Sequence, residues 1–225
     1  MSMILRYARY GAPVAFATAL LLALWAAPGE AQSQPSGHVN ASPERLLADF
    51  AAEEQGRSHG TATAGPNIAH VLNNSHRFPA QTVNAILTGL ERLALSSPDA
   101  RVRVGAASAF TTAGSRRNPR PIPGIAQRML RMYDRSQDRG VRRVLVSFMG
   151  RSAEPQVVIP FVRTLAIQDP HVADFPGAAS HALATLAAME GGRSVLQDLH
   201  ARGLVRDPGA RFELNELAKR DFRIR

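Results

Sequence analysis

Residues 97–114 read SPDARVRVGAASAFTTAG, and this stretch decides which fold we expect the chain to adopt. Its apolar residues recur with the spacing i, i+4, i+7, i+8 and i+11, at Val102, Ala106, Ala109, Phe110 and Ala113. Such spacing places the side chains on one face of a helix. The stretch therefore predicts an amphipathic helix with a buried apolar face. The two arginines inside it, Arg101 and Arg103, need a separate explanation.

The same apolar spacing recurs three more times along the chain. The further stripes are Val141, Leu145, Phe148 and Met149; Phe175, Ala179, Ala182, Leu183 and Leu186; and Ala210, Leu214, Leu217 and Ala218. The four stripes begin 39, 34 and 35 residues apart, and each follows another helical pattern, starting at Val83, Ile125, Val158 and Val195. A helical hairpin of this kind cannot bury its apolar stripe alone, so we expect four hairpins that stack on one another.

Three of the four second helices share a five-residue pattern of charged and apolar residues. The pattern is Asp99-x-x-Val102-Arg103, Asp138-x-x-Val141-Arg142 and Asp207-x-x-Ala210-Arg211, whereas the third unit has Val172, Phe175 and Pro176 in these places. An aspartate before a helix can accept hydrogen bonds from its free N–H groups. An arginine four residues later can reach the aspartate of the neighbouring unit. We therefore expect Arg103 to link adjacent units and Arg101 to be solvated.

This pattern resembles the HEAT repeat over about residues 80–222, and Pro160 near the start of a first helix is also typical of that family. Tetratricopeptide units are the rival interpretation, but their aromatic and glycine positions are not visible here. The resemblance implies an all-α solenoid of about four HEAT-like hairpins over residues 79–225. We expect a helical cap over residues 42–78, whose first helix begins after Ser42 and runs over about residues 43–54.

The N-terminal residues have the pattern of a secretory signal peptide. Arg6 and Arg9 precede an apolar segment at residues 12–27, and small residues precede a cleavage site after Ala31. We predict a signal peptide at 1–31, a flexible tail at 32–41, and a periplasmic or secreted protein. An uncleaved anchor is the alternative, although the sixteen apolar residues are fewer than the roughly 20 of a spanning helix, and no later segment reaches that length. The bias of the basic residues toward arginine suggests a bacterial genome rich in GC.

The positive charge is concentrated between Arg101 and Arg151, where twelve arginines face only Asp134 and Asp138. The candidate anion-binding or partner-binding residues are Arg116, Arg117 and Arg120 in a proline-rich loop, Arg128, Arg131 and Arg135 on one helical face, and Arg143. One interpretation is a solvated helix face beside an exposed loop. The other is one cationic surface that attracts an acidic protein, lipid headgroups or a polyanion. Nucleic acid is the least favoured partner because aromatic residues for base stacking are absent, apart from Tyr133.

No pattern of metal ligands, cofactor contacts or catalytic residues is recognisable. The pairs His70 with His76 and His171 with His181 do not have the i, i+3 or i, i+4 spacing of ligands on one helix. No histidine is followed by glutamate, as it is in the iron-binding enzymes that resemble this architecture. The chain also lacks cysteine and a G-x-S-x-G sequence. We therefore expect no metal, no cofactor and no enzyme activity, with a catalytic site dispersed over several repeats as the alternative.

The expected function is to bind another macromolecule, above all a protein. The HEAT resemblance implies that the second helices line the concave surface, which makes Arg143 and Ser147 candidate contact residues. The alternative is an envelope protein that binds an anionic partner through the surface from Arg116 to Arg135. Fold resemblance alone does not decide between these functions.

Overall fold

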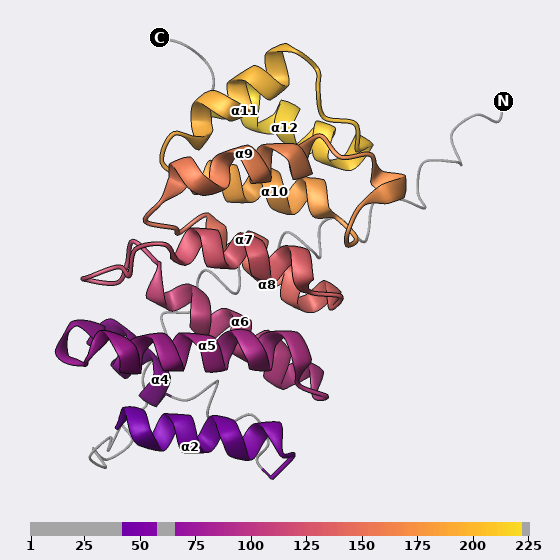
Figure 1. The fold of residues 1–225 in the computed structure, drawn as a ribbon. Coiled ribbons are helices and arrows are strands. Elements are labelled where there is room, and N and C mark those ends of the chain that lie inside the picture. Colours follow the sequence, from indigo (N-terminus) through magenta and orange to yellow (C-terminus); the bar gives the residue numbers. More distant parts are fainter. Residues whose placement is uncertain (1–41, 58–65, 222–225) are drawn as a thin grey trace, which may run out of the picture. The chain divides into compact units, whose positions relative to one another are not determined.

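The computed structural model describes residues 42–57 and 66–221, and these residues are helical, with no named β-strand among them (Figure 1). The α-helices are α2 (Pro43–Glu54), α4 (Pro66–Asn73), α5 (Ala80–Ser96), α6 (Ala100–Ala113), α7 (Ile125–Arg135), α8 (Arg139–Met149), α9 (Pro155–Ala166), α10 (Ala178–Ala187), α11 (Gly192–Ala201) and α12 (Pro208–Asp221). Two short 3₁₀ helices, η1 (Ser75–Arg77) and η2 (Pro170–Val172), lie between them. The all-α class is thus confirmed. The predicted signal peptide at 1–31 and tail at 32–41 lie outside the described residues.

Side-chain caps fix the starts of several helices at the predicted residues. Oγ of Ser42 accepts a hydrogen bond from the backbone N–H of Arg45, 3.2 Å away, and Pro43 occupies the first turn of α2. Asp99, Asp138 and Asp207 each accept a backbone N–H of the helix that follows, at 2.7 Å. Each such cap stabilises its helix by about 1 kcal/mol, because it satisfies a donor that no helical carbonyl can reach.

The helices contact one another in a regular order. Each first helix packs against its second helix, in the pairs α5 with α6, α7 with α8, α9 with α10, and α11 with α12. Second helices also contact the next second helix, α6 with α8, α8 with α10, and α10 with α12, while α7 packs against both α5 and α9 (Figure 1). Of the two helices in the predicted cap, α2 contacts α5 and α4 contacts α6.

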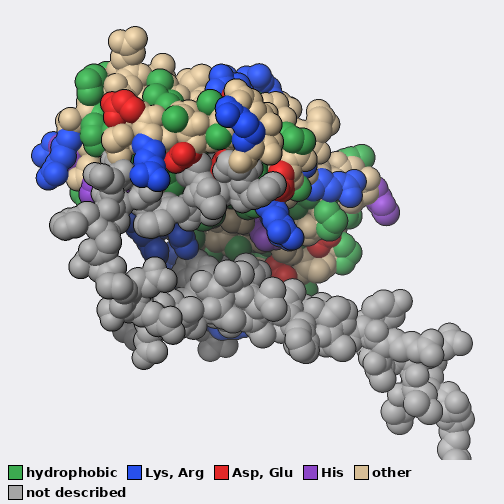
Figure 2. Space-filling model, turned by 90° about the horizontal axis from the view of Figure 1, so that it is seen from below, with side chains coloured by type: hydrophobic (Ala, Val, Ile, Leu, Met, Phe, Trp, Pro, Cys, Tyr) green, Lys and Arg blue, Asp and Glu red, His purple; other side chains and the backbone are tan. Residues whose placement is uncertain are grey.

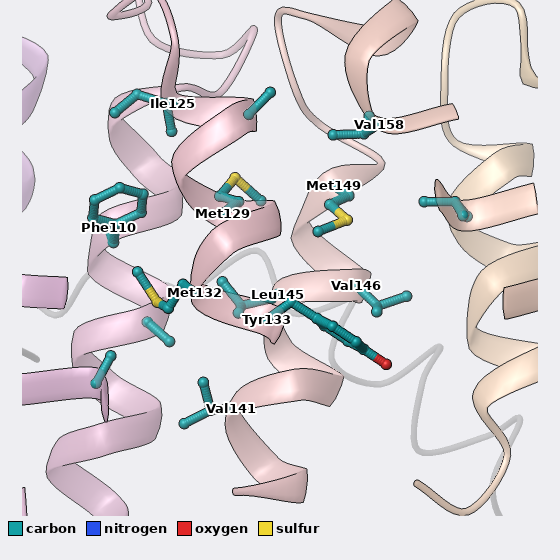
Figure 3. Packing of buried hydrophobic residues seen from close by; sticks show 14 of the residues in the cluster. Phe110, Ile125, Met129, Met132, Tyr133, Val141, Leu145, Val146, Met149 and Val158 are labelled. Carbon is teal, nitrogen blue, oxygen red and sulfur yellow. The ribbon is translucent and has the colours of Figure 1, made fainter. Parts of the chain in front are cut away.

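A single apolar cluster runs through these pairs. Figure 3 shows Met129 and Met132 of α7 beside Phe110 of α6 and Leu145 of α8, and all four side chains are buried. The predicted stripes are buried except at three positions. Phe148 is half-buried beneath the guanidinium of Arg151, and Leu217 and Ala218 are half-buried on α12. Among the described residues α12 packs mainly on α10 and α11, so less of its surface is covered.

The third unit departs locally from the regular hairpin. Pro176 and Gly177 precede α10, and Gly177 has a φ of +75°, which favours glycine because it carries no Cβ. Phe175 is buried but lies before the helix begins. The apolar stripe of this unit is therefore completed from the turn and not from within the helix.

Candidate functional site

The predicted link between Arg103 and the next unit is present. Nε of Arg103 donates to Oδ2 of Asp138 at 2.7 Å, and Nη2 lies 2.5 Å from the same oxygen. Oδ1 of Asp138 accepts the N–H groups of Gly140 and Val141 at the start of α8. Partial burial raises the pKa of Asp138, but the hydrogen bonds from Arg103 and the two N–H groups outweigh it and lower the pKa overall. This carboxylate thus joins α6 to α8 and caps α8.

The second link uses an acceptor that the sequence pattern did not identify. Nη1 of Arg142 donates to Oδ1 of Asp174 at 3.2 Å, and the guanidinium carbon lies 5.2 Å from the ring centroid of Tyr133. The hydroxyl of Tyr133 donates to Oδ2 of Asp174 at 2.8 Å. Burial, the hydrogen bond to Asp174 and the charge of Asp174 raise the pKa of Tyr133. The third unit has Val172 where the repeated pattern has aspartate, and Asp174 supplies the carboxylate for Arg142 in its place.

Arg211, the arginine of the last five-residue pattern, forms no ion pair with any described residue. Nε of Arg211 instead donates to the backbone carbonyl of Val205 at 2.9 Å. Arg103 makes an equivalent bond from Nη1 to the carbonyl of Ser97, also six residues earlier, at 2.7 Å. Arg103 and Arg211 therefore share a contact within their own turn, whereas Arg103 and Arg142 each reach an aspartate of the next unit.

Arg128 is not a free cation, contrary to the expectation of a solvated helix face. Its Nε donates to Oε1 of Glu91 at 2.8 Å, and Nη1 donates to Oδ1 of Asn84 at 3.1 Å. The guanidinium also lies 5.3 Å from the ring centroid of Phe110, and only 17% of the Arg128 side chain is exposed. The reason is that α7 packs against α5 along this face. Arg131 and Arg135 are exposed on α7, as expected for solvated residues.

The arginines of the proline-rich loop lie near two different cavities. Nη2 of Arg116 donates to the carbonyl of Ala188 at 2.7 Å. Arg117 lines a cavity of about 170 Å³ together with Arg151, a residue that no sequence pattern indicated as a candidate. Arg120 lines a second cavity of about 460 Å³. On the face drawn in Figure 2, basic side chains form several separate groups with acidic side chains between them.

The larger cavity lies between the start of α5 and the loop before α7. Its walls are mainly apolar, with Phe78, Val83, Leu87, Ile122 and Ile125, and its titratable residues are His76, Arg120 and Arg128. Partial desolvation and the neighbouring charges of Arg120 and Arg77 lower the pKa of His76. The guanidinium groups of Arg120 and Arg77 therefore lie close enough to His76 to disfavour a charged imidazole.

Arg143 and Ser147 lie on the exposed side of α8, where they meet α10. Oγ of Ser147 donates to the backbone carbonyl of Arg143 at 3.0 Å and lies 3.5 Å from Nδ1 of His181. The ring of His181 packs edge-on against Phe175, with 5.7 Å between the centroids. Burial and then the charge of Arg143 lower the pKa of His181, so the imidazole is neutral at pH 7. These residues form one continuous surface across two second helices.

In residues 42–57 and 66–221, no three histidine, aspartate or glutamate side chains are grouped so that they could hold a metal ion. No helix in the same ranges has both the length and the apolarity needed to cross a membrane.

No protein-family model, curated protein sequence or solved structure matches the chain.

Proposed function

We propose that this chain is a non-enzymatic, HEAT-like scaffold of the bacterial cell envelope that binds another protein through its second helices. The order of packing supports the repeat, because each second helix contacts the next one. The pairs Arg103 with Asp138 and Arg142 with Asp174 support it further, since both join successive second helices. In a stacked array of hairpins such contacts repeat from one unit to the next.

The surface made by Arg143, Ser147 and His181 carries the proposal of protein binding. Arg139, Arg143 and Ser147 are exposed at i, i+4 and i+8 on α8, and Ser147 meets His181 of α10. Small side chains at Ser147 and Ala184 allow another backbone to approach closely, while Arg143 and His181 supply hydrogen-bonding groups at the same place. Arginine is enriched where protein partners contact one another.

The proposed location rests on the N-terminal sequence. Arg6 and Arg9 before the apolar segment at 12–27, followed by small residues up to Ala31, fit an export signal. A partner is therefore to be sought in the envelope fraction of the bacterium that encodes the chain.

A crosslinked affinity purification from that fraction tests the proposal. Ser147→Arg places a bulky charge on the proposed surface and should remove a protein partner that the wild-type chain retains. Ser96→Arg is the matched control, because Ser96 is also exposed and its Oγ donates to the carbonyl four residues earlier, that of Arg92. Equal recovery of the partner by both variants would contradict a binding role for the α8–α10 surface.

Binding of an anionic partner through arginine residues is the second candidate function. It is favoured by the positions of Arg117 and Arg120, which are exposed and form no ion pair with a described residue. The joint variant Arg117→Gln and Arg120→Gln should abolish binding to anionic vesicles or a polyanion. Binding to these partners should also weaken as salt is raised. Arg128 is unsuitable for this test because its replacement would break the pair with Glu91.

A further inference from the structure

The cavity between the start of α5 and the loop before α7 has the size of a site for a small molecule. Its volume is about 460 Å³, and such sites occupy about 300 to 1,000 Å³. Apolar side chains line it from both elements, with Val83 and Leu87 on α5, Ile122 in the loop and Ile125 at the start of α7. Burial of an apolar ligand against these side chains would be favourable.

The loop that forms part of this cavity is held in place by its own hydrogen bonds. Oδ1 of the buried Asn118 accepts the N–H of Arg120 at 3.0 Å, and Nδ2 donates to the carbonyl of Ala113 at 3.4 Å. The N–H of Ile122 donates to the same carbonyl at 2.8 Å. Every second residue from 119 to 123 is proline, which fixes φ at these positions. The cavity therefore needs little ordering when a ligand enters it.

Two polar side chains of the lining have hydrogen-bonding capacity to spare. Ser75 is only 8% exposed, and its hydroxyl forms no hydrogen bond with a described residue. Oδ1 of Asn84 accepts Nη1 of Arg128, which leaves the amide N–H groups of Asn84 as donors. A buried hydroxyl without a partner favours a ligand that carries a polar group as well as an apolar body.

Arg120 brings to this cavity a positive charge that no described carboxylate balances. Its side chain is exposed and forms no ion pair with a described residue. The other arginine of the lining, Arg128, is paired with Glu91 at 2.8 Å. No aspartate or glutamate among the described residues lines the cavity. An anionic group beside Arg120 would therefore meet attraction without competition from a neighbouring carboxylate.

We propose that this cavity binds a fatty acid, whose carboxylate pairs with Arg120 and whose alkyl chain lies against the apolar side chains of α5 and the loop. One guanidinium balances one carboxylate and can bind both of its oxygens, whereas a phosphate dianion would need a second cation. The inference goes beyond both functions proposed above, because its ligand is a small amphiphile and neither a protein nor a polyanion. It shares only Arg120 with the anion-binding candidate.

Calorimetric titration of the purified full chain with decanoate, kept below the concentration at which decanoate forms micelles, tests the site. We expect saturable binding that Arg120→Gln weakens about tenfold, the effect of losing a charge-assisted hydrogen bond. Arg117→Gln is the matched control, since it removes an exposed arginine from the same loop, and it should change the affinity less than about twofold. Absence of saturable binding, or equal weakening by both variants, would overturn the site.

Two further ligands separate the charge from the apolar contacts. Decan-1-ol keeps the alkyl chain but carries no charge, so the wild-type chain and Arg120→Gln should bind it equally. Octanoate lacks two methylene groups and should bind about fifteenfold more weakly than decanoate, since each buried methylene contributes about fourfold. Equal affinities for octanoate and decanoate would show that the alkyl chain stays outside the cavity, and would overturn the proposal.

A variant that fills the cavity tests its location. Ala80 is exposed at the first position of α5 and lines the cavity, so a phenylalanine there would occupy the space without replacing a buried side chain. Ala80→Phe should abolish binding of both decanoate and decan-1-ol. Ala100→Phe is the matched control, because Ala100 is exposed at the first position of α6, and it should bind as the wild-type chain does. Equal binding by the two variants would place the ligand elsewhere and overturn the site.

Failure of this site is distinguishable from failure of the two functions proposed above. If the envelope partner is recovered but decanoate does not bind, the protein-binding proposal stands and the fatty-acid site is wrong. If a polyanion binds through Arg117 and Arg120 while decanoate does not bind, Arg120 belongs to a charged surface and the site is again wrong. If Arg120→Gln removes a protein partner and decanoate does not bind, the guanidinium serves a protein carboxylate, which also overturns the proposal.

Discussion

Asp138 serves two helices at once: its Oδ2 accepts Nε of Arg103 from α6 at 2.7 Å, while its Oδ1 accepts the N–H of Gly140 in α8 at 2.7 Å. The two oxygens thus have separate partners, one in the preceding unit and one in the same unit. The Arg103 and Asp138 side chains are only 23% and 17% exposed, so solvent screens the pair less than it screens a surface ion pair.

Replacing Asp138 with asparagine should destabilise the fold. The variant keeps a capping oxygen but loses the charge that pairs with Arg103, and we expect a cost of about 1 to 3 kcal/mol in the free energy of unfolding. Urea denaturation followed by circular dichroism measures this cost. Asp134→Asn, at an exposed site on α7, is the control and should cost less than about 0.5 kcal/mol. Equal stabilities for the two variants would contradict the structural role of Asp138.

The stabilisation from Asp138 should depend on pH. Its pKa is lower in the folded than in the unfolded state, so its contribution is complete above the unfolded value of 3.8 and is lost as pH falls through the lower folded value. The difference in melting temperature between the wild-type chain and Asp138→Asn should therefore be constant from pH 7 to pH 5 and shrink at lower pH. A difference that grows on acidification would show that the carboxylate pKa is raised instead.

The hydroxyl of Tyr133 should stabilise the second link. Tyr133→Phe keeps the ring beneath Arg142 and its edge-on contact with Phe161, at 4.8 Å between centroids, but it removes the hydrogen bond to Asp174. We expect a loss of about 1 kcal/mol in the free energy of unfolding. Phe161→Leu tests the ring contact separately. An unchanged stability for Tyr133→Phe would mean that water replaces the tyrosine hydroxyl without cost.

Gly192, at the start of α11, should tolerate no side chain. A Cβ at this position would overlap the backbone carbonyl of Leu186 in α10, and backbone atoms cannot move aside as a side chain can. Gly192→Ala should therefore destabilise the fold by more than about 2 kcal/mol in chemical denaturation. Gly209→Ala is the control, because the nearest atom there is a side-chain oxygen of Asp207 at 3.3 Å. Similar costs at both positions would contradict the close packing of α10 and α11.

Much of the helical pattern could be predicted from the sequence, because it depends on neighbours within one or two turns. The stripe from Val102 to Ala113 needs only the period of the helix, and the caps at Asp99, Asp138 and Asp207 need only the first turn of the helix that follows. The link from Arg103 to Asp138 was also predictable, since the same pattern repeats one unit later.

Contacts set by tertiary packing could not be read from the sequence. Arg128 pairs with Glu91 only because α7 packs against α5 on that face. Asp174 replaces the missing signature aspartate from a turn whose course depends on Pro176 and Gly177. Arg151 meets Arg117 only because a backbone bridge joins their loops. In each case the residue types were visible, but the element that they would meet was not.

Site-specific photo-crosslinking tests the central proposal most directly. A photoreactive phenylalanine derivative is placed at position 147 on α8, and at position 96 on α5 in a matched strain, and both strains are irradiated as intact cells. We expect a discrete crosslinked adduct with one envelope protein from position 147 and none from position 96. Adducts of the same protein from both positions, or from position 96 alone, would contradict binding through the second helices.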